Sequence, residues 1–287
     1  MNTSPKRSNT GGKKRNRRFR KPTEKELMNE YIFETETNLK DQKKIYENYQ
    51  YISQNEKDYY EKKFAVPKTR SQEIYTSMLK NKNKKIIIAT GPAGTGKTMF
   101  ATEYGIRNFL YGKCDKLIFT RPSVSVDEDL GYLPGTLEDK MAPWIRPIYD
   151  ILYQFISPKE VTELIEEKII EIAPLGYMRG RTFKNAWIVA DEMQNSTISQ
   201  MKMLLTRLGE NSRLAITGDL DQHDNKEMNG LEDFLDKFKN CRSSSIGSFE
   251  FEKEDIQREN VVKEVLDIYS RENIPEDYVG FSNTNND

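Results

Sequence analysis

Short runs of apolar, often β-branched residues recur along the middle of the chain, separated by longer segments with helical spacing. The runs predict strands at residues 85–90, 116–120, 186–190, 213–217 and about 245–251. The intervening segments predict helices near residues 97–111, 137–156, 196–208 and 228–239. Ser157 and Glu160 form a capping-box pattern, with Pro158 between them, that starts a further helix. Because strands that alternate with helices build a sheet covered on both faces, the pattern predicts an α/β fold with one parallel sheet.

Helical spacing of apolar residues is clearest in the segment that precedes Gly209. Ile198, Met201, Leu205 and Leu208 fall on one face of the predicted helix, and Gly209 is placed to end it. We therefore predict that these four side chains belong to the core and take no part in chemistry.

The two ends of the chain differ in composition from the alternating region, residues 67–270. Residues 23–66 are rich in charged residues and lack Gly, which predicts one or two charged helices before the boundary at Pro67. Residues 271–287 resemble a loose tail. Residues 1–22 hold nine Lys or Arg and no acid, so they are predicted to be a disordered basic arm. Such an arm can pair with nucleic-acid phosphates, but a solubilising tail and a localisation signal are equally open.

Composition narrows the class of protein. The chain has 287 residues, of which 31% are charged and 36% hydrophobic, and its formal net charge is zero. No apolar run approaches the roughly 20 residues of a membrane span, and the basic N-terminus leads into no apolar signal segment. The two cysteines form no C-x-x-C motif, so neither a disulfide framework nor a zinc site is expected. These features favour a cytoplasmic protein that is not bound to a membrane.

The strand predicted at 85–90 runs into G-P-A-G-T-G-K-T, a complete phosphate-loop motif. Its glycines let successive backbone N–H groups hold phosphate oxygens, and the helix that follows adds the positive end of its dipole. Lys97 can reach the β and γ phosphates of ATP, and the Thr98 hydroxyl can ligate Mg²⁺. The alternative is a glycine-rich turn that binds nothing. The predicted nucleotide-binding residues are Gly91, Pro92, Ala93, Gly94, Thr95, Gly96, Lys97, Thr98 and Met99.

An acidic pair, Asp191-Glu192, follows the apolar strand A-W-I-V-A. Open α/β sheets bind ligands at the carboxyl ends of their strands, where this pair and the phosphate loop meet. Asp191 is then predicted to hold Mg²⁺, and Glu192 to orient and deprotonate the attacking water. The alternative is two surface acids after a buried strand.

A third strand end carries Gly218-Asp219 and, shortly after, Gln222. These residues are candidates to sense the γ-phosphate or the attacking water. His223, the sole histidine, cannot build a histidine-based metal site and is expected to be structural or a secondary contact.

Basic and aromatic residues alternate in G-Y-M-R-G-R-T, which contains Tyr177, Arg179 and Arg181, and Arg121 ends a predicted strand. Trp144, Arg146 and Tyr149 add to the set. Such side chains suit RNA or single-stranded DNA, because bases stack on aromatic rings and phosphates pair with arginines. The alternatives are a basic loop that stabilises its own domain, or arginines that face ATP.

Two long segments resemble the PhoH family closely. Residues 117–152 contain T-R-P, G-Y-L-P-G and P-W-I-R-P-I-Y-D, and residues 170–224 continue the family pattern through G-D-L-D-Q-H-D. The resemblance covers about residues 67–270. It departs at Met193, where the family usually has Ala, at Asp127-Glu128 in place of a glycine-glutamate pair, and at Glu259-Asn260 in place of His-Pro.

The resemblance implies a single RecA-like P-loop NTPase domain similar to the first motor domain of superfamily-one helicases. Members of the family bind ATP, often form hexameric rings, and are linked to RNA metabolism and phosphate starvation. Gln72 matches the family's adenine-contacting glutamine. Arg258 matches an arginine that, by analogy, would reach a neighbouring subunit's γ-phosphate as an arginine finger. An ion pair with Glu254 or Glu259 is the alternative for Arg258.

Three functions are compatible with the predicted ATP site and the family resemblance. The first is a helicase-like or translocating ATPase motor that acts on RNA or single-stranded nucleic acid. The second is an ATPase that gates a ribonuclease. Because the 66 residues before Pro67 are too few for a nuclease domain, this function needs a partner nuclease or a nuclease site that the motifs do not reveal. The third is a nucleotide-switched RNA-binding scaffold without turnover.

Overall fold

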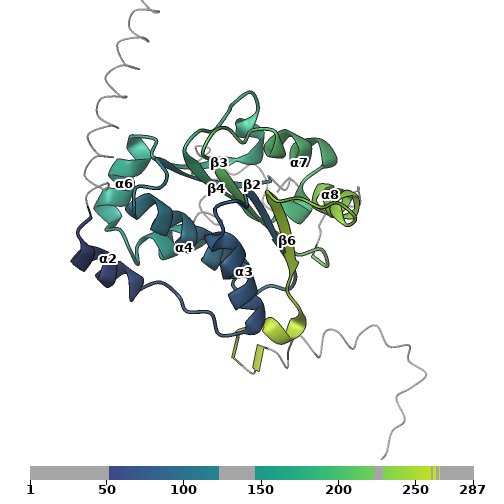
Figure 1. Ribbon diagram of the computed structural model, residues 1–287, viewed down its shortest axis with the longest axis horizontal. Coiled ribbons are helices and arrows are strands. Elements are labelled where there is room, and N and C mark those ends of the chain that lie inside the picture. The colour runs from purple at the N-terminus through teal and green to yellow at the C-terminus, as the bar shows by residue number, and fades with distance from the viewer. Residues whose placement is uncertain (1–51, 123–145, 223–228, 260, 263–264, 266–287) are drawn as a thin grey trace, which may run out of the picture. The chain divides into compact units, whose positions relative to one another are not determined.

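A computed structural model of the chain describes residues 52–122, 146–222, 229–259, 261–262 and 265. Helices and strands alternate along most of it, as predicted (Figure 1). The helices are α2 (Gln54–Glu61), α3 (Arg70–Lys80), α4 (Lys97–Leu110), α6 (Pro158–Glu166), α7 (Ile198–Leu205) and α8 (Gly230–Phe238). The strands are β1 (Ile86–Thr90), β2 (Lys116–Arg121), β3 (Ile170–Pro174), β4 (Ala186–Ala190), β5 (Arg213–Thr217) and β6 (Ile246–Glu250). Short 3₁₀ helices follow three of the strands: η1 (Leu175–Met178), η2 (Met193–Asn195) and η3 (Lys253–Asp255).

Six strands of the described residues form one sheet in the order β3-β2-β4-β5-β1-β6, and every neighbouring pair is parallel. The predicted α/β class with a parallel sheet is confirmed. Because β4, β5 and β1 are adjacent, the loops that follow their carboxyl ends emerge side by side at one edge. The phosphate loop follows β1, so this edge is where the predicted catalytic residues meet.

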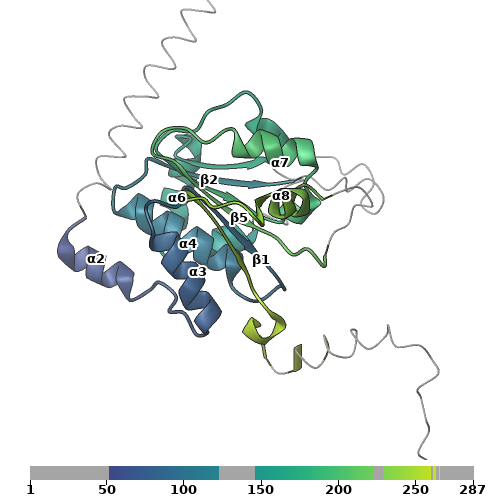
Figure 2. The same cartoon turned by 45° about the vertical axis from the view of Figure 1, so that its right-hand side comes forward.

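Helices cover both faces of the sheet, and successive strand residues point to opposite faces. In β1, Ile87 packs into the core formed with α3, α4 and α6, whereas Ile88 packs into the core formed with α7 and α8. Figures 1 and 2 show α3 and α4 on one side of the sheet and α7 and α8 on the other. Both faces are buried because the connections between parallel strands place helices on each side of the sheet.

Strand β3 was not predicted from the sequence. Its apolar residues follow α6 after a short turn that includes Lys168 in a left-handed conformation (φ 56°), so the sequence shows no clear break between helix and strand. It forms the edge of the sheet by pairing with β2.

The helix before Gly209 is shorter than predicted, and the prediction of which side chains it buries is partly wrong. Helix α7 ends at Leu205, and Ile198 is 37% exposed. Met201 is buried, as predicted, together with Leu204. Gly209 instead permits a close backbone approach, since a Cβ there would lie 2.4 Å from the Phe183 carbonyl oxygen.

Parts of the predicted organisation lie outside the described residues: the basic arm 1–22, most of the charged segment 23–66, and the tail 271–287. Within the described remainder of the charged segment, α2 is helical as predicted. Its N-terminus is a capping box made by Ser53 and Glu56.

Arg213, at the start of β5, ties the C-terminal end of α3 to the sheet. Its guanidinium donates hydrogen bonds to the carbonyl oxygens of Leu79 (2.8 Å), Lys84 (2.9 Å) and Asn81 (3.0 Å), and it stacks over the Trp187 ring. Burial lowers the pKa of Arg213 to about 10. The cation therefore binds a carbonyl in the last turn of α3 and two carbonyls in the segment that joins α3 to β1.

We expect Arg213→Met to lower the free energy of unfolding by about 2–4 kcal/mol, because several carbonyls would lose a charged donor. Urea denaturation measures the change. Arg70→Met at the opposite end of α3 is the control, since its side chain is 83% exposed and pairs only with Glu73 in the described structure; we expect it to cost less than about 0.5 kcal/mol. Equal losses in the two variants would contradict this role.

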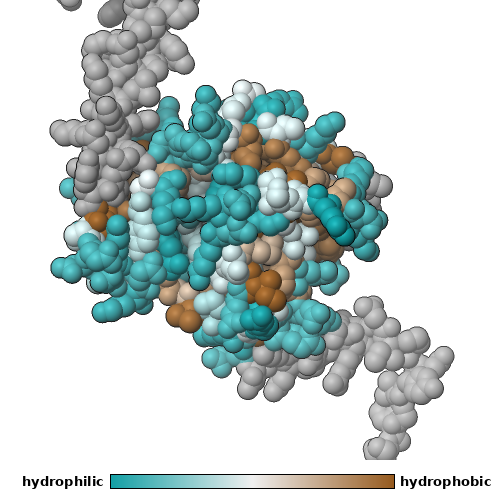
Figure 3. Space-filling model, viewed as in Figure 1, coloured by the Kyte–Doolittle hydropathy of each residue, from teal (hydrophilic) through white to brown (hydrophobic). Residues whose placement is uncertain are grey.

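No helix among the described residues is long and apolar enough to cross a membrane. The face drawn in Figure 3 is mainly hydrophilic, with hydrophobic residues in scattered patches.

Candidate active site

The phosphate loop, residues 91–98, lies between the carboxyl end of β1 and the first turn of α4. Gly91 has a φ of 117°, and a Cβ at this position would lie 2.2 Å from the backbone oxygen of Phe251, so only glycine fits. The Lys97 ammonium donates hydrogen bonds to the carbonyl oxygens of Gly91 (2.5 Å) and Pro92 (2.7 Å). Lys97 thus lies across its own loop, where phosphate oxygens could replace the two carbonyls as its partners.

Lys97 is 8% exposed, and burial lowers the pKa of its ammonium group. Three carboxylates act in the opposite direction, in this order of effect: Asp219, Asp191 and Glu192. The loop therefore holds one cation close to acids from two other strand ends.

A cavity of about 370 Å³ opens beside the loop. Its lining includes the loop itself and residues from five other segments: Ala93, Gly94, Gly96, Lys97, Thr98, Met99, Arg121, Pro147, Ile148, Ile151, Asp191, Glu192, Gly218, Asp219, Gln222 and Arg258. The structure thus brings together most of the residues predicted for the active site, and the cavity is lined by both cations and carboxylates.

Thr98 and Asp191 are in direct contact. The Thr98 hydroxyl lies 2.7 Å from Oδ1 of Asp191, and the Thr217 hydroxyl also donates to that oxygen. Hydroxyl and carboxylate oxygens are the ligands that Mg²⁺ prefers, usually completed by phosphate oxygens and water. The donor set therefore fits the predicted magnesium site.

Glu192 has a left-handed backbone conformation (φ 53°), which is uncommon for a residue other than glycine. Its carboxylate accepts a hydrogen bond from Nε2 of Gln194 (2.5 Å). The other end of the same amide, Oε1 of Gln194, accepts from the backbone N–H of Asp219 (3.1 Å). Gln194 is 2% exposed, so a buried amide joins the end of β4 to the end of β5.

The β5 strand end is organised around Asp219, which is 7% exposed. Burial raises the pKa of Asp219, whereas the N–H of Asp221 and the Lys97 ammonium lower it. Gln222 lines the cavity and donates its backbone N–H to the Asp219 carbonyl oxygen at 3.2 Å. His223 lies outside the described residues.

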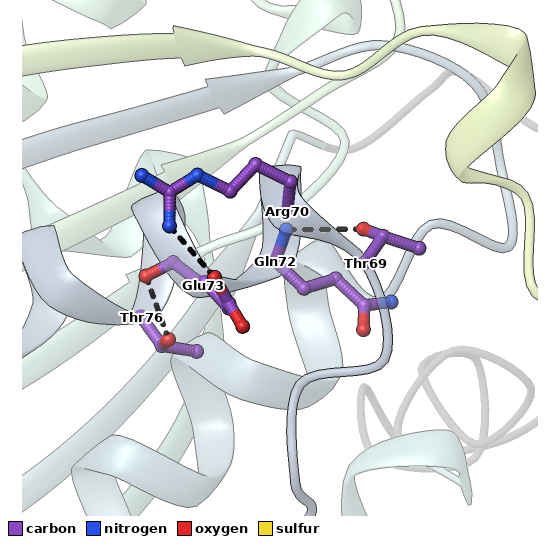
Figure 4. A network of polar contacts seen from close by, with 5 residues as sticks. All are labelled: Thr69, Arg70, Gln72, Glu73 and Thr76. Carbon is purple, nitrogen blue, oxygen red and sulfur yellow. Dashed lines mark hydrogen bonds and ion pairs between the residues drawn. The ribbon is translucent and has the colours of Figure 1, made fainter.

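Gln72 lies in the first turn of α3, whose N-cap is Thr69 (Figure 4). Its amide Nε2 donates to the Thr95 carbonyl oxygen at 3.0 Å, and its Oε1 accepts from the Lys68 N–H at 2.7 Å. Gln72 therefore stabilises the phosphate loop through a backbone carbonyl, and it does not line the cavity described above. Contact with adenine stays a prediction.

Residues 65–270 match the family profile described as "PhoH-like protein". The chain belongs to the PhoH family. A PhoH-like protein of Synechocystis is 40% identical over 206 residues, which are 71% of this chain and 62% of the relative. A PhoH-like protein of Bacillus subtilis is 39% identical over 208 residues, which are 72% of this chain and 64% of that protein.

Protein PhoH of Escherichia coli is 41% identical over 192 residues, which are 66% of this chain and 54% of that protein. The chain thus matches less than two thirds of the length of each of these three relatives. The match covers residues 65–270, which contain the sheet and the phosphate loop. The predicted RecA-like P-loop fold agrees with this family membership.

The four residues predicted to contact nucleic acid occupy different environments in this PhoH-family chain. Tyr177 is 61% exposed and Arg179 is exposed, both after β3. Arg121 lines the cavity beside the phosphate loop. This position agrees with the alternative prediction, in which an arginine of this set faces the nucleotide. Arg181 forms a bidentate ion pair with Glu171 and stacks on the Phe183 ring. These contacts agree with the other alternative prediction, in which a basic residue stabilises its own domain.

Other predicted features of the PhoH pattern are only partly described. Trp144 and the motif G-Y-L-P-G lie outside the described residues. Arg146 is exposed, and Tyr149 stacks with Tyr153, their ring centroids 5.6 Å apart.

Two functional residues were missed from the sequence, Thr217 and Gln194. Thr217 directly precedes Gly218 at the end of a buried strand, and Gln194 belongs to the D-E-M-Q run that contains the acidic pair. Their proximity to predicted residues was the available signal. The direction of their side chains could not be read from it.

We expect Gln194→Ala to lower kcat for ATP about 10–100-fold with little change in nucleotide affinity, since the carboxylate of Glu192 would lose its buried partner. Steady-state kinetics and nucleotide titration separate the two effects. Asn229→Ala is the control: Asn229 caps α8, so its loss should cost about 1 kcal/mol of stability and leave kcat unchanged. Equal kcat values for Gln194→Ala and Asn229→Ala would contradict a positioning role.

Proposed function

We propose that this PhoH-family protein binds ATP with Mg²⁺, hydrolyses it, and uses the cycle to act on RNA or single-stranded nucleic acid as a helicase-like motor. One observation carries the proposal: the ends of the adjacent strands β1, β5 and β4 bring a complete phosphate loop, Asp219, and the Asp191–Glu192 pair to one cavity, and Thr98 contacts Asp191 there. A glycine-rich turn that binds nothing would not require this convergence of charged groups.

The proposed reaction assigns a role to each group. Lys97 and the N–H groups of the loop hold the phosphates, and Thr98 and Asp191 hold Mg²⁺, which neutralises phosphate charge when bound. Water attacks the γ-phosphorus, the bond to the β–γ bridging oxygen breaks, and Glu192 accepts the proton of the water. Gln222, at the same cavity, is proposed to orient that water.

Nucleic acid is proposed as the substrate on which the energy acts. Tyr177 and Arg179 support this, because both are exposed and follow the carboxyl end of β3, and the phosphate loop follows the carboxyl end of the parallel strand β1 in the same sheet. An exposed ring can stack on a base, and an exposed guanidinium can pair with phosphate. Assembly into a ring, with a hexamer as the expected size, is part of the proposal and rests on the family resemblance.

The test is ATP turnover by the purified chain with single-stranded RNA, with single-stranded DNA and with neither, at several protein concentrations. We expect one nucleic acid to stimulate turnover, and Tyr177→Ala with Arg179→Ala to reduce the stimulation while basal turnover is kept. Turnover without stimulation would overturn the motor and leave the gating of a partner nuclease. Binding of ATP without any turnover would favour the nucleotide-switched scaffold.

A further inference from the structure

The segment that leaves β6 runs along the phosphate loop of the same chain. The Phe251 N–H donates to the Thr90 carbonyl oxygen at 2.8 Å, just before the loop begins. Further along, the Gln257 N–H donates to the Gly94 carbonyl oxygen at 3.0 Å. Two backbone hydrogen bonds thus hold residues 251–257 against the start and the middle of the phosphate loop.

Arg258 follows directly and packs on the middle of the loop. A Cβ added at Gly94 would lie 2.9 Å from Nε of Arg258 and 3.0 Å from its Cγ. Gly94 also has a φ of 84°, so this position combines a left-handed backbone with close contact to the arginine stem. The side chain from Cγ to Nε therefore lies along its own chain's phosphate loop.

Arg258 lines the same cavity as Lys97, Glu192 and Gln222. Among the side chains that the structure describes, none forms an ion pair or hydrogen bond with it, and the alternative pairing with Glu254 or Glu259 is not formed. A guanidinium has five donors in a planar fork that matches phosphate oxygens. It is thus placed at the cavity with its donors available for an anion.

Resting on the proposed function, we infer that Arg258 contacts the terminal phosphates of the nucleotide bound to its own chain, and not those of a neighbouring chain. A finger that serves a neighbour has to project away from its own loop, whereas the stem of Arg258 is packed on Gly94 and its backbone is anchored one residue earlier at Gln257. Each subunit then carries a complete set of charged groups for phosphate binding.

This inference changes the expected behaviour of mixed assemblies. Arg258→Ala chains keep an intact phosphate loop, and Lys97→Ala chains keep an intact Arg258. If an arginine served its neighbour, mixing the two inactive chains would restore active interfaces. If it serves its own chain, each chain in the mixture lacks one essential group and no activity returns.

The experiment measures ATP turnover of both variants alone and mixed in equal amounts, at concentrations where the parent protein is most active. We expect Arg258→Ala to lower kcat about 100-fold, Arg258→Lys to recover part of the loss, and the mixture to show no more than the average of its components. Arg242→Ala, an exposed arginine near the start of β6, is the matched control and should turn over ATP like the parent. Restored activity in the mixture, or normal turnover by Arg258→Ala, would overturn the inference.

Failure of the proposed function would give a different result: the parent protein and Lys97→Ala would turn over ATP at the same rate. In that case, nucleotide titration still decides the inference: Arg258→Ala should reduce the preference for ATP over ADP about 10-fold if the guanidinium contacts the γ-phosphate. An unchanged preference would overturn it. If the parent binds neither nucleotide, both the inference and the proposed function are wrong.

Discussion

Lys97→Ala is expected to weaken ATP binding by at least about 100-fold, because the phosphates would lose the charged donor that lies within their own loop. Lys97 lines the cavity, and its ammonium already holds two loop carbonyls in the position where phosphate oxygens would compete for it. Titration with a fluorescent ATP analogue measures the effect.

Lys85→Ala is the matched control for this change. Lys85 is exposed and precedes β1, at the opposite end of the strand from the loop, so its removal should leave ATP affinity within about twofold. Thermal unfolding of both variants shows whether the loop stays folded. ATP affinity retained in a folded Lys97→Ala protein would show that the loop is not the nucleotide site.

Glu192→Gln is expected to bind ATP like the parent and to lower kcat by about 10²–10⁴-fold, since an amide cannot accept the proton of the attacking water. The substitution is conservative because the amide oxygen can still accept the hydrogen bond from Gln194. Single-turnover hydrolysis measured with saturating enzyme isolates this step from product release.

Glu210→Gln provides the comparison for a change in charge alone. Glu210 is exposed in the loop that precedes β5, at the edge of the sheet away from the cavity, and we expect its substitution to leave kcat unchanged. Hydrolysis by Glu192→Gln at the rate of the parent would show that another group activates the water, and Asp219 would be the next residue to test.

The inferred contact of Arg258 with its own nucleotide bears on why such a chain would assemble. An arginine finger supplied by a neighbour would make oligomerisation necessary for turnover. Arg258 packed on Gly94 of its own loop removes that requirement. Any ring would then serve to couple subunits to one another or to nucleic acid, and turnover per chain would depend only weakly on protein concentration.

The sequence was sufficient for the fold class and for the chemistry of the phosphate loop. Strands such as 186–190 are buried on both faces and therefore read as continuous apolar runs, and the loop motif specifies its own backbone by its glycines. Asp191 and Glu192 were predicted correctly to lie beside Lys97, because parallel strands place their carboxyl ends at one edge. These features are local, or follow from one topological rule.

Only the tertiary structure decided the contacts between side chains far apart in sequence. It showed that the amide of Gln194 bridges β4 and β5, that Arg181 is occupied by Glu171, and that Arg258 lies against Gly94 more than 160 residues earlier. A sequence states which residue follows a strand, but the direction of its side chain depends on backbone angles and on neighbours that the fold supplies. For this protein the sequence therefore determined which groups gather at the phosphate loop, and the fold determined which of them face the cavity and which are engaged elsewhere.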